Sequence, residues 1–109
     1  MARQSRPESE ASMDPVQTDP EHYAVEFENE NVRVLRIRFG PKERSEMHTD
    51  PPMIAIFLTD QHSRHTYSDG TTEEMNGKAG EVRYIDAWEH SPENLSDKAF
   101  ELIAVELKS

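Results

Sequence analysis

The sequence predicts an all-β domain, an antiparallel sandwich or closed barrel of about eight or nine short strands. Short runs rich in Val, Ile, Phe and Tyr are separated by Gly, Pro, Asn and Asp at close spacing, which is the pattern of strands joined by tight turns. No stretch of the chain shows a sustained helical period. Because no helix is predicted to cover a sheet edge, we expect the sheets to close on each other and remove exposed edges.

Residues 1–20 differ in composition from the rest of the chain. They carry three prolines, several Ser and Glu and few apolar side chains, so we expect a flexible leader there. A functional docking tail is the alternative. The remaining residues, 21–109, are enough for one compact core, and we expect a single β-barrel domain over this range.

The first two strands follow this leader. Tyr23, Val25 and Phe27 alternate as a strand with one buried face, and the polar run at 28–31 supplies a turn. The second strand is expected over 32–39, where a Gly-Pro pair ends it. These two segments therefore predict neighbouring antiparallel strands.

The middle of the chain predicts a buried strand and a hairpin. Residues 53–58 are apolar enough to be buried on both faces. Residues 64–67 lead through Ser-Asp-Gly into 71–75, which predicts a hairpin, and further turns are expected at 76–77 and 79–80. A short strand at 82–85 follows.

The strands at 32–39 and 100–107 share an uncommon pattern. In both, the apolar alternation slips by one residue midway. A slip moves the following side chains to the opposite face, as happens at a β-bulge or where a strand passes from one sheet to the other. Burial on both faces explains the pattern equally well, and both explanations make these strands core.

Charge and composition exclude several classes of function. With 22 acidic and 12 basic residues the net charge is −10, which opposes binding to nucleic acid and to anionic membrane surfaces. The chain has no cysteine, so disulfides, thiolate metal sites and cysteine nucleophiles are excluded. It shows neither the apolar core of a secretory signal nor an apolar run long enough to span a bilayer, and we expect a cytoplasmic location.

One group of residues can carry chemistry. His48 and Asp50 form a His-x-Asp pair, and on an extended segment their side chains project from the same face. His90 lies beyond the strand at 82–85. Two histidines and one carboxylate are the ligands of a facial triad, which binds Fe, Mn, Ni or Zn as a divalent ion and leaves positions open for substrate. The alternative is a solvated loop pair with His90 in a turn.

From Tyr23 to Lys108 the chain resembles the small single-domain cupins, in particular the short bacterial proteins labelled cupin 2 barrel or β-alanine degradation protein. The residues that carry the resemblance are GPKERSEMHTDPP at 40–52 and GEVRYIDAWEHSPEN at 80–94. They follow the outline of the two cupin motifs, and His90 and Asn94 keep the spacing of the second. The resemblance implies an antiparallel double-stranded β-helix, the cupin or jelly-roll barrel, and a homodimer.

The departures from those motifs bear on the metal. Asp50 stands where the first motif has its second histidine, and Ile54 and Ala55 occupy the window of its glutamate. A four-ligand cupin site is therefore not available. Asp50 is either a substitute ligand or the mark of a lost site.

Other residues have weaker claims to the site. We assign Trp88, Asn94 and Met53 to the pocket or to the surroundings of the ligands; rim or dimer-interface packing is the alternative for Trp88, and core filling for Met53. The remaining histidines are expected to lie on an exposed hairpin or outside any site, and these are His62, His65 and His22.

Two functions from different classes fit these observations. The first is a metal-dependent enzyme that acts on a small organic acid or related metabolite, with His48, Asp50 and His90 as ligands. The second is a non-catalytic barrel that binds a small molecule or serves as an accessory protein. The 2-oxoglutarate oxygenases share the triad, but no arginine follows His90 to hold the 2-oxoglutarate carboxylate. A stoichiometric amount of bound metal would distinguish the metal-dependent enzyme from the non-catalytic barrel.

Overall fold

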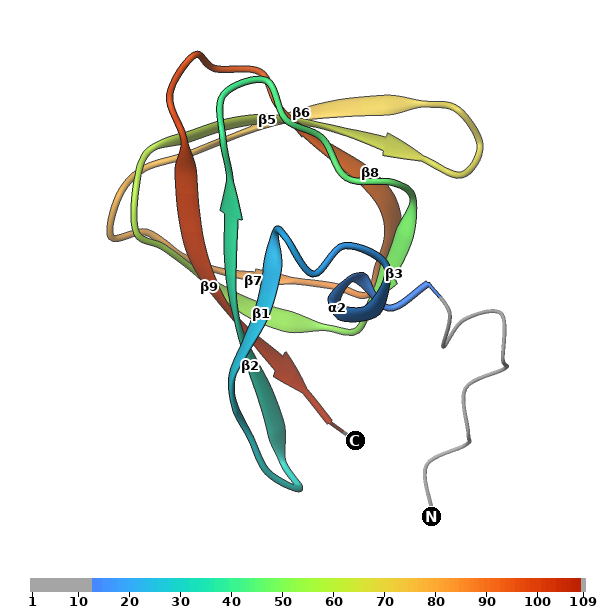
Figure 1. The fold of residues 1–109 in the computed structure, drawn as a ribbon, viewed down its shortest axis with the longest axis vertical. Coiled ribbons are helices and arrows are strands. Elements are labelled where there is room, and N and C mark those ends of the chain that lie inside the picture. The colour runs from blue at the N-terminus through green and yellow to red at the C-terminus, as the bar shows by residue number, and fades with distance from the viewer. Residues whose placement is uncertain (1–12, 109) are drawn as a thin grey trace.

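The computed structural model describes residues 13–108, and within them the chain forms two antiparallel sheets (Figure 1). A one-turn helix, α2 (Pro15–Thr18), precedes the strands. The strands are β1 (Tyr23–Glu28), β2 (Val32–Phe39), β3 (His48–Asp50), β4 (Met53–Phe57), β5 (Gln61–Tyr67), β6 (Thr72–Gly77), β7 (Val82–Ile85), β8 (Trp88–Asn94) and β9 (Phe100–Leu107). The all-β prediction is confirmed.

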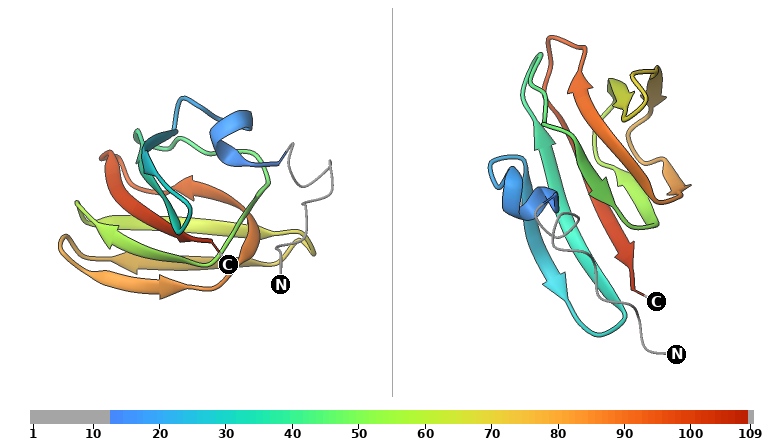
Figure 2. Two further views of the ribbon diagram at one scale, coloured as in Figure 1. Left: turned by 90° about the horizontal axis from the view of Figure 1, so that it is seen from below. Right: turned by 90° about the vertical axis from the view of Figure 1, so that its right-hand side faces the viewer.

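The sheets pair strands that are distant in the sequence. One sheet has the order β1-β2-β9-β4-β7 and the other β3-β8-β5-β6. Figure 1 shows β2 and β9 side by side, with β3 and β8 at the other side of the molecule. Helix α2 contacts β1 and β3 at one end, outside the sheets (Figure 2). The chain therefore alternates between two layers that enclose one interior.

The two sheets contribute different chemistry to that interior. The hydrophobic core cluster comes from the five-stranded sheet: Tyr23, Leu35, Ile37, Phe39, Met53, Ala55, Phe57, Phe100, Leu102 and Ala104. The four-stranded sheet instead buries polar groups, namely His48, Asp50, Gln61, Ser63, His65, His90, Ser91 and Asn94. Burying polar groups is costly unless they are hydrogen-bonded. This sheet is therefore the place to look for a site.

The paired strands β2 and β9 do not contain the predicted slip. Their register runs without interruption from Val32 opposite Leu107 to Phe39 opposite Phe100. Burial alternates strictly along β9, and the inward position near its end is taken by the buried Glu106. The expectation of a bulge or a crossing between sheets in these strands is wrong. The apolar residues that suggested it lie half-buried on the outer face, and the irregularity in this sheet falls between Val25 and Phe27 of β1.

The predicted leader over 1–20 extends too far. Asp14 and Pro15 are buried, and Asp14 caps α2 through the main-chain N–H of Val16 at 3.1 Å. Its carboxylate also accepts two hydrogen bonds from Arg33, at 2.9 and 3.0 Å. Residues 13–20 are thus packed against the barrel, since a polar segment can bury a carboxylate when a guanidinium pairs with it. Residues 1–12 lie outside the described part of the chain.

Two further details differ from the sequence-based expectation. The pair at 76–77 is the end of β6 and not a turn. Residues 48–50 and 88–94 form regular strands, β3 and β8, that pair with each other.

Within residues 13–108, no helix is long and apolar enough to cross a membrane.

Candidate metal centre

The register of β3 and β8 brings the three predicted ligands together. His48 lies opposite His90, and Asp50 lies opposite Trp88. Residues that face each other across antiparallel strands point to the same side of the sheet, and so do residues two apart on one strand. The four side chains therefore form one block on the inner face of the four-stranded sheet.

The donor atoms of this block converge on one point. His90 Nε2 lies 2.8 Å from Asp50 Oδ2, and His48 Nε2 lies 3.3 Å from the same oxygen. One ligand atom from each residue lies within 4.8 Å of the others, and all three residues are buried. Ligand atoms bound to one metal ion at about 2.0–2.2 Å lie about 3–3.5 Å apart. This buried His-Asp-His group can therefore hold a metal ion with little movement.

A hydrogen bond places a proton on one nitrogen of His48. Its Nδ1 lies 2.9 Å from the main-chain oxygen of Glu46, which can only accept, so Nδ1 carries a proton. The other ring nitrogen, Nε2, lies 3.3 Å from Asp50 Oδ2. A proton or a metal ion on Nε2 is therefore held next to a buried carboxylate, which attracts either cation.

His90 is connected to a second buried histidine. His90 Nδ1 lies 2.9 Å from His65 Nδ1, and His65 Nε2 lies 2.8 Å from Ser63 Oγ. When His90 Nε2–H donates to Asp50, His90 Nδ1 accepts from His65 Nδ1–H. His65 Nε2 then accepts from the hydroxyl of Ser63. A metal ion at His90 Nε2 would require the proton of His90 to be on Nδ1. His90 Nδ1–H would then donate to His65 Nδ1, and His65 Nε2–H would donate to Ser63 Oγ. No net proton leaves the chain in this exchange.

The buried groups have shifted pKa values. Burial alone raises the pKa of Asp50, but hydrogen bonds from His48 and His90 outweigh it and bring the pKa well below its usual range. Burial, reinforced by the neighbouring His90, lowers the pKa of His65 to about 3. Burial also lowers the pKa of His90, against the opposing effect of Asp50. At neutral pH the centre thus holds a carboxylate between uncharged imidazoles at His65 and His90.

Trp88 encloses the centre from one side. Its ring stacks on His90 with centroids 3.9 Å apart and on His65 at 4.8 Å. Its Nε1–H donates to Asp50 Oδ2 at 3.1 Å. The structure therefore makes Trp88 a wall of the pocket that also orients the carboxylate.

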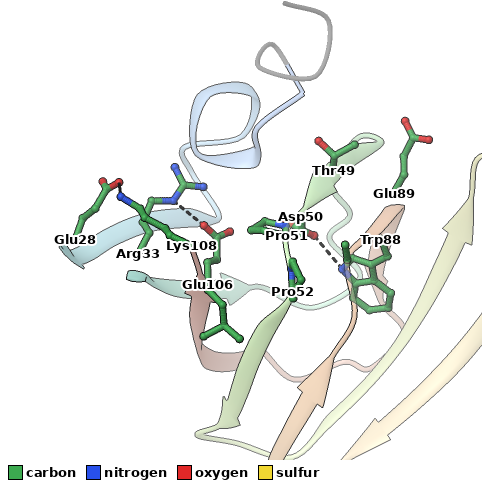
Figure 3. Close-up of a pocket in the computed structure, with 12 residues that line it drawn as sticks. Glu28, Arg33, Thr49, Asp50, Pro51, Pro52, Trp88, Glu89, Glu106 and Lys108 are labelled. Atoms are coloured by element: carbon green, nitrogen blue, oxygen red, sulfur yellow. Dashed lines mark hydrogen bonds and ion pairs between the residues drawn. The ribbon is translucent and has the colours of Figure 1, made fainter. Parts of the chain in front are cut away.

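Asp50 and Trp88 separate two cavities. Figure 3 shows the outer one, an open vestibule of about 600 Å³ lined by these two residues together with Arg33, Glu106 and Lys108 among others. The inner one is a chamber of about 40 Å³ inside the barrel, lined mostly by apolar core residues and also by His65 and His90. A ligand in the vestibule meets the Asp50–Trp88 wall, while the inner chamber has room only for something the size of one or two water molecules.

Ion pairs line the vestibule. Arg33 Nε donates to Glu106 Oε1 at 2.7 Å, and Lys108 Nζ lies 2.6 Å from Glu28 Oε2 (Figure 3). Burial raises the pKa of Glu106, although the hydrogen bond from Arg33 lowers it. The Arg33 guanidinium thus bridges the carboxylates of Asp14 and Glu106 and fastens the segment that carries α2 beside the vestibule.

The remaining predicted residues fall in different places. Met53 is buried and lines the inner chamber. Asn94 is fully buried, but its amide donates to the main-chain oxygens of Gly40 and Lys98 at 3.0 and 2.8 Å, so it holds loops together. His62 is half-exposed on the hairpin, where it pairs with Glu74.

One expectation about the histidines is wrong. His65 is not exposed but 3% accessible, because the alternation of β5 turns it inward beside His90. His22 lies away from the centre, where it stacks on Phe39 with centroids 4.2 Å apart and pairs with Asp19 at 2.6 Å.

Comparison with known proteins identifies the fold. No family model and no curated protein matches the chain in sequence. A cupin-domain protein of Bordetella pertussis Tohama I is similar in structure, with a TM-score of 0.74, 22% identity, and coverage of 80% of this chain and 92% of that one. A Klebsiella pneumoniae protein with a double-stranded β-helix domain has a TM-score of 0.60 and 17% identity, covering 76% and 72%. This chain has the cupin fold.

The cupins with a similar structure include an enzyme. A Bacillus subtilis oxalate decarboxylase with Mn(II) centres has a TM-score of 0.57 and 20% identity, and the match covers 72% of this chain and 22% of that one. At these sequence identities, the structural similarity shows that the proteins share a fold and does not show a shared function. The double-stranded β-helix expected from the motifs is therefore confirmed, and the chemistry depends on the centre itself.

Proposed function

We propose that this cupin binds one divalent metal ion at His48, Asp50 and His90 and uses it to bind, and act on, a small organic acid or related metabolite. The observation that carries the proposal is the convergence of three ligand atoms inside the barrel, with His48 Nε2 and His90 Nε2 at 3.3 and 2.8 Å from Asp50 Oδ2. A buried carboxylate of this kind is costly without a cation or hydrogen-bond donors around it. When bound, the metal supplies a Lewis acid with open positions.

Charge supports an acidic ligand. The centre contributes one negative charge from Asp50, because burial lowers the pKa of His65 and His90 and keeps them neutral. A divalent ion makes the net charge of the centre about +1. In a buried site this favours an anionic oxygen ligand. Trp88, which lines the vestibule, offers a flat surface against which a small ligand can pack.

Two nitrogen donors and one carboxylate are suited to Fe, Mn, Ni or Zn. Manganese has support from the structural likeness to an enzyme with Mn(II) centres. We therefore propose a first-row divalent ion and manganese as the first ion to test.

Elemental analysis tests the proposal. Protein without a tag is stripped with chelator, dialysed separately against Mn(II), Fe(II), Ni(II) and Zn(II), and analysed by plasma mass spectrometry. We expect about one ion per chain, and binding at least about 100-fold weaker in Asp50→Asn, which removes the charged ligand but keeps the shape. Asp97→Asn, at an exposed aspartate, is the matched control and should bind as the wild type does.

If the folded wild type retains no metal, the enzyme proposal is wrong. The protein would then be a non-catalytic cupin that binds a small molecule or serves as an accessory protein, and Asp50 would mark a lost site. Metal that persists in Asp50→Asn would also contradict the ligand assignment.

We also propose that two copies associate through the outer face of the five-stranded sheet, in the cytoplasm. A row of apolar residues crosses all five strands there: Phe27, Val34, Val105, Ile54 and Tyr84, each opposite the next. Phe27 and Tyr84 are each 54% exposed. An exposed apolar row of this length is typical of an interaction surface, and the lack of cysteine agrees with a reducing compartment.

A further inference from the structure

Tyr23 brings a further polar group to the centre, and no role there was predicted for it from the sequence. It lies at the start of β1, is 5% exposed, and its hydroxyl oxygen lies 3.3 Å from His48 Nε2. Its ring meets the His48 imidazole edge-on, with centroids 5.2 Å apart and an interplanar angle of 78°. In the neutral His48 ring with its proton on Nδ1, Nε2 accepts and the phenol donates. The hydroxyl is thus aimed at the lone pair that a metal ion would use.

A metal ion bound at His48 Nε2 would take away the acceptor of this hydroxyl, which lies 3.3 Å from the same nitrogen. A buried hydroxyl without a partner is destabilising. A ligand that presents an oxygen atom to this side of the centre would supply a new acceptor.

We propose that Tyr23 is a ligand-binding residue of the centre, which donates a hydrogen bond from its phenol to the metal-bound oxygen of an acidic ligand. This inference rests on the proposed function, since it requires a metal at His48. Tyr23 then selects ligands that present an acceptor oxygen next to the ion. Its buried position on β1, edge-on to Phe39 at a centroid distance of 6.0 Å, keeps the hydroxyl in place.

Ser45 is the other group close enough to compete for this hydroxyl. Ser45 Oγ donates its own proton to Asp19 Oδ2 at 2.5 Å. It therefore has no proton to give to a ligand, and it can only accept from Tyr23. If the phenol turned to Ser45 on metal binding, it would make no contact with a ligand, and the experiment below separates these two cases.

The test uses the full chain loaded with Co(II), whose visible spectrum reports both metal uptake and the arrival of a ligand. Oxalate is the probe, as the smallest acid with two carboxylates. We expect Tyr23→Phe to bind Co(II) as the wild type does and to bind oxalate about tenfold or more weakly, as expected for the loss of one hydrogen bond to a charged group. Tyr84→Phe, at an exposed tyrosine, should leave both affinities unchanged.

The outcomes are distinct. Equal oxalate affinity in Tyr23→Phe and the wild type overturns the inference and makes Tyr23 structural. Loss of Co(II) binding in Tyr23→Phe overturns it in another way, since Tyr23 would then be a metal ligand. A folded wild type that takes up no Co(II) contradicts the proposed function, and the inference falls with it.

A second measurement covers the case in which Tyr23→Phe does not fold. The wild type is labelled with 3-fluorotyrosine, loaded with Zn(II) and titrated with oxalate, and the resonances of Tyr67 and Tyr84 are assigned with their own Phe variants. We expect the third resonance, from Tyr23, to shift on oxalate binding. An unmoved Tyr23 resonance on a ligand-saturated protein overturns the inference.

Discussion

At the scale of single residues, the centre depends on Asp50 as a shared acceptor. His90 Nε2 and Trp88 Nε1 donate to one of its oxygens, at 2.8 and 3.1 Å, and His48 Nε2 faces the same atom. Charge-assisted hydrogen bonds of this kind are stronger than neutral ones and keep the carboxylate ionised in a buried place. The same atom therefore organises the residues of the centre and gives it its charge.

The pH dependence of stability follows from His65 and His90. Burial lowers the pKa of both, that of His65 from 6.5 to about 3. Between pH 6.5 and the folded-state values the unfolded chain binds more protons, so the free energy of unfolding falls as the pH drops. We expect the metal-free protein to lose stability from pH 7 to pH 5, by up to about 1.4 kcal/mol per pH unit for each histidine. Urea unfolding at pH 5, 6 and 7 measures this slope.

His65→Gln is the variant that tests this assignment. It should flatten the dependence on pH, because it removes one of the two buried imidazoles. His62→Gln, at the half-exposed histidine of the same strand, should keep the wild-type slope. An unchanged slope in His65→Gln would mean that His65 titrates alike in the folded and unfolded chain.

Sequence and structure agree on the three candidate ligands but not on their surroundings. His48, Asp50 and His90 were visible from the spacing of two motifs. His65 and Tyr23 were not, because their roles depend on which strands become neighbours. The alternation of Gln61, Ser63 and His65 along one face of β5 was a usable signal, since three polar residues on an inward face indicate a buried network.

At the scale of elements, the inner faces of the two sheets have different roles. One stabilises the fold, and the other carries the candidate metal centre. The five-stranded sheet supplies the apolar core, and the short pairing of β3 with β8 carries the centre. Strand positions were predictable where apolar residues alternate, as in β2 and β7. The strands β3 and β8 were missed because their inward residues are polar, and hydrophobic periodicity does not mark such strands. The helix α2 was missed because a single turn has no period.

Gly77 is the point where β6 packs on the core. A side-chain carbon added there would overlap the ring of Phe57, which is 1% exposed. We expect Gly77→Ala to lower the free energy of unfolding by about 2 kcal/mol or more, as overpacked cores do. Urea unfolding followed by circular dichroism measures the loss.

Asn76→Ala is the matched control for this position. Asn76 precedes Gly77 on the same strand but is exposed, so its truncation should change stability by no more than about 0.5 kcal/mol. A Gly77→Ala variant as stable as the wild type would show that β6 can move away from Phe57.

At the scale of the whole molecule, the outer face of the five-stranded sheet shows why the apolar pattern of β2 and β9 was difficult to interpret. Val34 and Val105 lie on this face, opposite to the core side of the same strands. A sequence shows that a residue is apolar but not which of two surfaces it belongs to. The apparent slip therefore combined residues of the core with residues of a second surface, which we assign to the dimer.

The size of this face is sufficient for a dimer. The five strands lie about 4.8 Å apart and together have 31 residues at about 3.3 Å each, which gives about 500 Å² per copy. The total of about 1,000 Å² is the minimum for a specific interface and fits a weak dimer. The apolar row that crosses the face, from Phe27 to Tyr84, carries no charge. The charged residues of this face, Arg36, Arg38, Glu26 and Glu101, are paired with one another. Since each copy has a net charge of −10, the uncharged row is where two copies can meet with least repulsion.

We therefore expect a dimer in sedimentation velocity, and we expect added salt to strengthen it, because screening reduces the repulsion between two acidic chains. The double variant Val82→Glu, Tyr84→Glu adds two charges at 63% and 54% exposed positions of the face and should give monomers. Thr72→Glu, exposed on β6 of the other sheet, should remain dimeric. A wild type that stays monomeric at high salt and high concentration would contradict the dimer and leave the exposed row for a different partner.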